Sequence, residues 1–421
     1  MSRIVLTCWG SYGDLFPYLG LARELKARGH IPVVATCPFY RELVEAEGLR
    51  LQPLRPDVDP TDRKLLERVM DPVRGPEVVV KEIVVGHLAE SYADVTEATR
   101  GAELVISHPA TCATPIVCAE QRLPWISTVL SPASFFSVYD FPAVPPRVEL
   151  SVLTRHSSWV ARAFLALARR ATRSWMAPVE ALRASRGLPP AGPPLFEGQF
   201  SPMGTLALFS NVMARPRRDW PPHSEVTGFV FYNRPIAMPD ALTAFLDRGE
   251  PPIVFTLGSS AVGAPGTFYD ESVKAAAALG RRAVFLVGKY SPALSQSQLP
   301  ENMLAVDVAP HDALFPRAAA IVHHGGVGTT GQALRSGRPM LVVPHSHDQP
   351  DNAARVSRLG VGRSLDARKY TAERAAAQLR ILLEQPSYRQ RAEIVGIQVR
   401  SENGTAAACD AIERSGPRKE P

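Results

Sequence analysis

"AAIVHHGGVGTTGQALRSGRPMLVVPHSHDQPDN", residues 319–352, is the stretch that decides the fold. A short apolar run precedes a glycine-rich turn, a helical pattern follows it, and PMLVVP reads as the next strand. Glycines at such a turn let the backbone approach an anion at the positive end of the helix. GVGTTG also matches the G-x-G-x-x-G pattern of dinucleotide-binding enzymes, with Asp348 about 20 residues further on. The stretch therefore predicts a phosphate ligand and leaves open which one.

Three details of the same stretch argue against a redox cofactor. The dinucleotide pattern normally follows the first strand of its domain, whereas this loop follows several strands. Asp348 comes only after the complete strand PMLVVP, within the polar run HDQPDN. His324 enters the glycine loop directly, where an imidazole can donate a hydrogen bond to a pyrophosphate oxygen. We therefore favour a nucleotide-sugar ligand, with NAD(P) as the alternative.

Two series of alternating strands and helices extend outward from this loop. The first begins with RIVLTCW and contains IPVVATC, AELVISH and PWISTVL, and the second begins with PPIVFTLGSS and contains RRAVFLVG and NMLAVDVAP. The pattern predicts an α/β protein with two Rossmann-like doubly wound domains facing across a cleft. We expect an N-terminal domain over 1–235, a linker over 236–250, a C-terminal domain over 251–405 and a partly disordered tail over 406–421.

Composition places the chain among ordinary soluble enzymes. It has 421 residues, 45% hydrophobic and 21% charged, and its net charge of +6 comes with no dense basic run. We therefore expect no nucleic-acid partner. Five cysteines without a C-x-x-C pair argue against a zinc site or disulfide framework and favour the cytoplasm. We expect neither a signal peptide nor a membrane-spanning segment.

Two further groups of residues have competing interpretations. His323, His324, His345 and His347 could chelate a metal ion, but their spacing lacks the usual ligand geometry, so we expect none. The arginine-rich segment 155–186, with Trp159, Phe164 and Trp175, could lie on an anionic membrane. We favour an ordinary surface helix pair that lines a substrate pocket, because arginines occur on several of its faces.

The N-terminal stretch GSYGDLFP, residues 10–17, follows the first predicted strand. One interpretation of Asp14 is an N-cap residue, which stabilises a helix by about 1 kcal/mol. The other is a carboxylate that faces the cleft and takes a proton from a substrate hydroxyl. The helix dipole would lower the pKa of Asp14 and weaken it as a base.

With these two stretches the chain resembles the family 1 glycosyltransferases of GT-B architecture, especially bacterial natural-product, sterol and rhamnosyl enzymes. That family transfers sugars from nucleoside diphosphates to small lipophilic acceptors. HGGVGT at 324–329 is similar to the H-C-G-W-N-S part of the family's donor box, and Asp348, Gln349 and Asn352 match D-Q-x-x-N. APH at 309–311 stands near the start of the box, with Val308 in place of the usual tryptophan. G-S-x-G-D-x-x-P matches bacterial members, except that Tyr12 replaces an arginine.

The resemblance implies a role for each matching residue. The donor diphosphate would contact His324, Gly326, Gly328, Thr329, Ser259 and Ser11. Gln332 would reach the ribose, Val308 and Ala309 the base, and Asp348 and Gln349 the sugar hydroxyls. Asp14 would be the base, and His108 is a candidate partner that orients it.

The resemblance also implies the reaction, an inverting transfer without a metal or other cofactor. The donor would be a UDP- or dTDP-hexose, and the D-Q pair favours glucose. The acceptor would be a small hydrophobic molecule with a hydroxyl group, such as a natural product, phenol, sterol or lipid. Three alternatives stay open at this point: an NAD(P)-dependent oxidoreductase, a nucleotide-sugar 2-epimerase, and a non-catalytic partner that binds sugar nucleotides.

Overall fold

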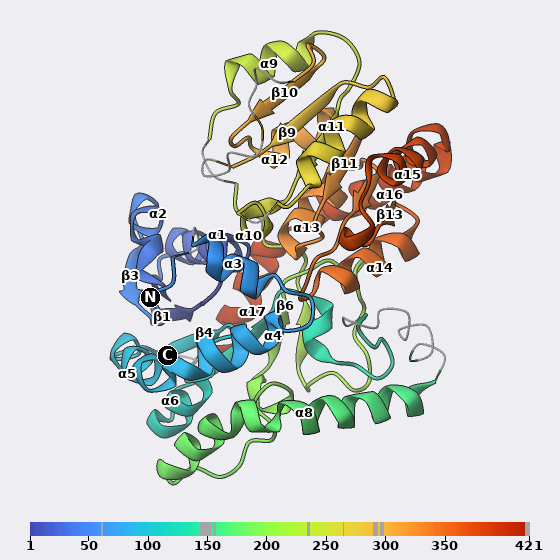
Figure 1. The fold of residues 1–421 in the computed structure, drawn as a ribbon. Helices are drawn as coiled ribbons and strands as arrows, with labels where there is room; N and C mark the ends of the chain where they lie inside the picture. The colour runs from blue at the N-terminus through green and yellow to red at the C-terminus, as the bar shows by residue number, and fades with distance from the viewer. Residues whose placement is uncertain are drawn as a thin grey trace.

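The computed structural model describes residues 1–59, 62–143, 154, 157–233, 236–263, 265–288, 294 and 299–416. These residues contain two parallel sheets, one from each half of the chain (Figure 1). The first has the order β3-β2-β1-β4-β5-β6-β7. Its strands are β1 (Arg3–Thr7), β2 (Ile31–Thr36), β3 (Arg50–Pro53), β4 (Leu104–Ser107), β5 (Trp125–Val129), β6 (Thr205–Ala207) and β7 (Ser224–Val226).

The second sheet has the order β10-β9-β8-β11-β12-β13. Its strands are β8 (Ile253–Thr256), β9 (Ala283–Leu286), β10 (Met303–Val306), β11 (Ala320–His323), β12 (Met340–Val342) and β13 (Gly362–Ser364). Each sheet therefore begins at an inner strand, β1 or β8, and reverses its strand order beside it. Ligands of such sheets bind at this reversal, outside the carboxyl ends of the strands.

Helices cover both faces of the first sheet because its strands are apolar on both faces. Ile4 and Leu6 pack toward α1, whereas Val5 between them packs toward α5 and α6. The helices of this half are α1 (Tyr12–Ala27), α2 (Arg41–Ala46), α3 (Arg63–Val69), α4 (Gly75–Glu77), α5 (Leu88–Ala98), α6 (Thr114–Gln121) and α8 (Ser158–Ser185).

The second sheet is covered in the same way. Phe255 packs toward α11 and α15, while Val254 packs toward the opposite layer, which contains α9, α13, α14 and α16. The helices of this half are α9 (Asp240–Asp247), α10 (Gly258–Ala261), α11 (Phe268–Ala278), α12 (His311–Leu314), α13 (Val327–Ser336), α14 (Gln349–Leu359), α15 (Ala372–Glu384) and α16 (Pro386–Ser401). The structure thus has the doubly wound α/β architecture that the sequence predicts.

The last helix corrects the expectation of a tail over 406–421. Residues Gly404–Ser415 form α17, which leaves the second half and packs on α1 of the first (Figure 1). Cys409 and Ile412 of α17 are fully buried there. The sequence interpretation overlooked this helix because its buried face consists mostly of small residues. Residues 417–421 lie outside the described part of the chain.

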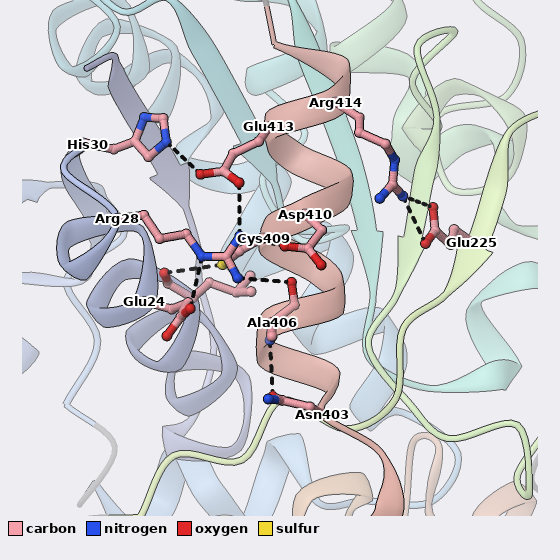
Figure 2. A network of polar contacts seen from close by, with 11 residues as sticks. Glu24, Arg28, His30, Glu225, Asn403, Ala406, Cys409, Asp410, Glu413 and Arg414 are labelled. Atoms are coloured by element: carbon pink, nitrogen blue, oxygen red, sulfur yellow. Dashed lines mark hydrogen bonds and ion pairs between the residues drawn. The ribbon is translucent and has the colours of Figure 1, made fainter.

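Ion pairs reinforce the contact of α17 with the first half (Figure 2). Arg28 donates hydrogen bonds to Asp410 at 2.6 Å and to Glu413 at 2.9 Å. Arg414 forms an ion pair with Glu225 of β7 at 2.8 Å on the other side of the helix. The chain therefore crosses between the two halves twice, once before α9 and once before α17.

A cleft of about 1160 Å³ lies between the two halves. Tyr12, Phe16 and Tyr40 line it from the first half, and Val308, Gly328 and Gln332 line it from the second. Within the described residues, we find no helix that is long and apolar enough to cross a membrane. The fold thus places the two predicted motifs on opposite walls of one cleft.

Candidate active site

The glycine loop connects β11 to α13. Its first two glycines are required because neighbouring side chains lie too close to the backbone to leave room for a Cβ. Gly325 has a φ of +92°, and a Cβ there would lie 2.7 Å from a methyl carbon of Val342. A Cβ on Gly326, the N-cap of α13, would lie 2.4 Å from Nε2 of His324. No side chain caps this helix, so the N–H groups of its first turn remain available. Because Gly328 and Thr329 line the cleft, the first turn of α13 presents its N–H groups there in the arrangement that helix N-termini use to bind anions.

His324 is enclosed beside this loop as an uncharged imidazole. Its ring lies between Gly258 and Gly326, and the side chain is 4% exposed. Burial, followed by the neighbouring His323, His345 and His311, holds the pKa of His324 well below its ordinary value. Its buried Nδ1 has no hydrogen-bond partner. His324 can therefore serve a diphosphate as a neutral hydrogen-bond donor but not as a counter-ion.

The residues predicted to hold the nucleoside line the same cleft. Val308 and Ala309 lie on its wall, next to His311, whose ring stacks on Phe315 at a centroid distance of 4.4 Å. Gln332 also lines the cleft, and its Nε2 lies 3.5 Å from Oδ1 of Asn233. The amide of Gln332 is thus already oriented by a residue of the connection between the halves.

Asp348 and Gln349 lie at the start of α14. Both side chains already accept hydrogen bonds within the protein, which leaves fewer of their atoms available to a sugar. Oε1 of Gln349 accepts hydrogen bonds from the backbone N–H of His345 at 2.8 Å and of Ser346 at 3.2 Å. Oδ2 of Asp348 accepts one from Asn352 at 2.8 Å. Burial, together with the charge of Asp14, raises the pKa of Asp348 to about 6. Each side chain therefore already has one oxygen engaged within the protein.

Ser259 belongs to the short helix α10 after β8, but its side chain lies outside the described part of the structure. The turn before it is described. Gly258 has a φ of +63° and donates its backbone N–H to Oγ1 of Thr256 at 3.2 Å. Gly258 lines the cleft.

Asp14 lies beside Tyr12 and Gly13 of the opposite wall and belongs to the cap of α1. Ser11 is the N-cap residue, and Asp14 is the third helical position, so the interpretation of Asp14 as the N-cap itself is wrong. Oδ2 of Asp14 accepts hydrogen bonds from the backbone N–H of Ser11 at 2.7 Å and from its hydroxyl at 3.0 Å. The two residues form a capping box. Gly10 is required beside it, because a Cβ there would lie 2.3 Å from Oδ2.

The second oxygen of Asp14 faces His108, which follows β4. Nε2 of His108 lies 3.5 Å from Oδ1 of Asp14. Nδ1 of His108 accepts the backbone N–H of Ala110 at 3.1 Å, so the neutral ring carries its proton on Nε2. Burial acts to raise the pKa of Asp14, but the hydrogen bonds from His108 and Ser11 outweigh it and lower that pKa. The structure thus brings Asp14, Ser11 and His108 together.

Two residues at the cleft escaped the sequence interpretation of the site. Tyr12 packs against Phe16 and Tyr40 and forms an aromatic wall opposite the glycine loop. Asn233 bonds to Gln332 from a proline-containing connection that carries no motif. Among the described residues, no group of three or more His, Cys, Asp or Glu side chains is close enough to hold a metal ion.

Comparisons with known proteins identify the family of this chain. Residues 284–409 match the family model for the erythromycin biosynthesis protein CIII-like C-terminal domain. The chain is 35% identical to the O-mycaminosyltylonolide 6-deoxyallosyltransferase of Streptomyces fradiae, over 98% of this chain and 97% of that protein. The chain belongs to the family 1 GT-B glycosyltransferases. The oxidoreductase, epimerase and non-catalytic alternatives are therefore set aside.

Two further comparisons show how widely this glycosyltransferase fold is shared. The glycosyltransferase is 26% identical to the sterol 3-beta-glucosyltransferase of Neurospora crassa over 98% of this chain but only 27% of that much longer protein. It superposes on the spinosyn rhamnosyltransferase SpnG complexed with thymidine diphosphate with a TM-score of 0.70 at 18% identity. That match covers 98% of this chain and all of the other, and it supports the fold.

Proposed function

We propose that this glycosyltransferase is an inverting, metal-independent enzyme that transfers a hexose from a UDP- or dTDP-sugar to a hydroxyl of a small lipophilic acceptor. The observation that carries the proposal is the pair of opposed groups at the cleft. Oδ1 of Asp14 lies outside the capping box on the first half. The uncapped first turn of α13 lines the cleft from the second.

In the proposed step, Oδ1 of Asp14 takes the proton of the acceptor hydroxyl. The acceptor oxygen forms a bond to the anomeric carbon as the bond from that carbon to the diphosphate oxygen breaks. The leaving nucleoside diphosphate keeps the electron pair, and its charge is met by His324 and by the N–H groups of Gly328 and Thr329. A single displacement of this kind inverts the anomeric configuration.

The donor sugar is the least constrained part of the proposal. The D-Q pair favours glucose, and the relative from Neurospora crassa is a glucosyltransferase. Against glucose, Oε1 of Gln349 is already engaged by backbone N–H groups, and the relative from Streptomyces fradiae is named for a 6-deoxyhexose. The thymidine diphosphate complex of SpnG supports testing dTDP donors beside UDP donors.

A matrix of donors and acceptors tests the proposal directly. UDP-glucose, dTDP-glucose and dTDP-rhamnose are incubated with macrolide, phenol and sterol acceptors in the presence of EDTA, and products are identified by mass and anomeric configuration. We expect transfer with at least one dTDP or UDP donor and inversion at the anomeric carbon. Retention of configuration, or activity that EDTA abolishes, would contradict the mechanism. Absence of any thermal stabilisation by UDP or dTDP would contradict the donor assignment.

Membrane contact is a separate hypothesis, which concerns the described part of segment 155–186. The exposed face of α8 carries Trp159 and Leu167, at 78% and 61% exposure, together with Arg162 and Arg170. Sedimentation with vesicles of anionic and of neutral lipid tests it. Binding to neither kind of vesicle leaves α8 as a surface helix. The sequence interpretation of a helix pair here is wrong in one respect, because Ser158–Ser185 form a single continuous helix.

A further inference from the structure

The largest fully buried side chain among the described residues is Arg355 of α14, and the proposed transfer step does not use it. Its Nε donates to Oδ2 of Asp351 at 2.7 Å, and its Nη1 donates to Oδ2 of Asp140 at 2.6 Å. Burial opposes the charge of Arg355, but the two carboxylates outweigh burial and raise its pKa. A guanidinium and two carboxylates therefore form an ionised cluster in the interior.

This cluster joins the two halves of the enzyme. Arg355 and Asp351 belong to α14 of the second half, whereas Asp140 lies beyond β5 of the first. The other oxygen of Asp351 accepts the backbone N–H of Ala143 at 3.1 Å. Residues 137–143, here called the acceptor-side segment, are thus bound by α14 at two points.

The acceptor-side segment is anchored from its own half as well. Val138 and Phe141 belong to an apolar cluster with Leu165 of α8. Asp219 accepts the hydroxyl of Ser137 and the backbone N–H of Val138, both at 2.7 Å. The segment follows the carboxyl end of β5, at the edge of the sheet where Asp14 and His108 also lie. It therefore lies at the carboxyl edge of the first sheet, the edge at which such sheets bind ligands. Its residues Val138 and Tyr139 line a neighbouring pocket of about 1230 Å³ and not the cleft itself.

The first turn of α14 is also bonded to the glycine loop. Asn352 donates from Nδ2 to the backbone carbonyl of Gly325 at 2.9 Å and to Oδ2 of Asp348 at 2.8 Å. Within little more than one helical turn, α14 thus contacts both the glycine loop and the acceptor-side segment. Packed interiors transmit a shift of one contact to the next because they have little free volume.

We propose that the buried Asp140–Arg355–Asp351 cluster couples donor binding at the glycine loop to the ordering of the acceptor-side segment. Donor diphosphate at the loop fixes Gly325 and α14, and α14 holds residues 137–143 in place through Asp140 and Ala143. The acceptor wall is then complete only when the donor is present. This inference rests on the proposed donor site but adds residues that touch neither donor nor acceptor.

An ion cluster can couple the glycine loop to the acceptor-side segment because it is unfavourable to separate only one of its charges from the others. A buried charge that loses its partner stays desolvated and uncompensated, so the contact is either made or broken as a unit. Nη1 of Arg355 also donates to the backbone carbonyl of Met213 in the first half at 3.1 Å, whereas its Nη2 is buried without a hydrogen bond. Asp140 also lies 3.7 Å from Arg358, which balances the two carboxylates with two guanidinium groups.

The test is amide hydrogen exchange of the full-length enzyme with and without dTDP, repeated with UDP. In the wild type we expect nucleotide to slow exchange both in the glycine loop and in residues 137–143. Asp140→Asn keeps the Arg355–Asp351 pair within α14 and removes the charge on the other half. In this variant nucleotide should still slow exchange in the glycine loop, but the slowing in 137–143 should fall at least about fivefold.

Asp219→Asn is the matched control, because Asp219 bonds to the same segment from within its own half. It should speed exchange of 137–143 without nucleotide but preserve the slowing caused by nucleotide. An equal nucleotide response of 137–143 in Asp140→Asn and wild type, or no response in wild type, would overturn the proposal. If neither nucleotide slows exchange in the glycine loop, the proposed donor site is wrong. That result is distinct from a loop that is protected while residues 137–143 are not.

Discussion

The two walls of the cleft differ in the charge of their functional groups. On the first half, Asp14 is an ionised carboxylate held by the Ser11 cap and by His108. On the second half, the proposed diphosphate site consists of backbone N–H groups at a helix N-terminus and of His324, which burial keeps uncharged. Neutral donors stabilise a developing anion without binding the released product as tightly as a counter-ion would. The comparison suggests that proton transfer and anion binding are assigned to different domains.

The largest effect should come from removing the charged group of the first wall. Asp14→Asn should lower kcat by roughly 10³-fold because the amide cannot accept the acceptor's proton. The dissociation constant for dTDP or UDP, measured by calorimetry, should stay within twofold of wild type. Glu42→Gln, which removes another carboxylate from the cleft lining, is the control and should keep full activity. Equal activity of Asp14→Asn and wild type would end the assignment of Asp14 as the base.

Removing the neutral group of the second wall should have a smaller effect of a different kind. His324→Ala should weaken dTDP binding by about 1 kcal/mol, the usual value of a hydrogen bond between protein and ligand. Because the pKa of His324 lies well below its ordinary value, this loss should not vary between about pH 6 and pH 9. A loss that grows steeply as pH falls would show that His324 binds as an imidazolium and would remove the contrast between the walls.

Substitutions of His108 test how Asp14 on the first half stays ionised. His108 lowers the pKa of Asp14, and activity requires the ionised carboxylate, so activity is lost as pH falls through that pKa. His108→Ala should therefore move the acidic limb of the pH profile of kcat/KM to higher pH. His108→Gln, which retains an N–H donor, should move it less. If both variants lose activity equally at every pH, His108 takes part in proton transfer itself.

The groups that face Asp14 define the rest of its pH dependence. Cys8, Tyr18, Tyr40, His347 and Asp348 all interact with its charge. The pKa values of Cys8, Tyr18 and Tyr40 are raised chiefly by burial, so these groups stay neutral. The acidic limb should consequently reflect Asp14 together with Asp348, whose pKa is raised to about 6.

The smallest effect is the one on stability. Ser11→Ala removes the hydroxyl that bonds to Asp14 and accepts the N–H of Gly13, and it should cost about 1 kcal/mol of unfolding free energy. Thr329→Ala at the uncapped helix of the other wall should change the free energy of unfolding by less than about 0.5 kcal/mol. Urea denaturation measures both. Equal losses would show that the two helix starts do not differ in the way described.

Local patterns predicted most of the fold and the neighbourhood of the site. Apolar runs and glycine turns indicated both sheets, and G-S-x-G-D together with H-G-G-V-G-T indicated residues that lie near or line one cleft. The helix α17 was missed because alanine and glycine give a weak periodic signal. The Asp140–Arg355 pair could not be predicted, since 215 positions separate its members and only tertiary packing brings them together.

The return of α17 to the first half limits how this enzyme can be divided. A hybrid that takes its second half from a relative needs two junctions, one before α9 and one between α16 and α17. A single junction would import a foreign last helix, whose side chains would have to replace Cys409 and Ile412 in the interior and Asp410 and Glu413 beside Arg28. Donor preference can therefore be exchanged as an insert, but not as a C-terminal swap.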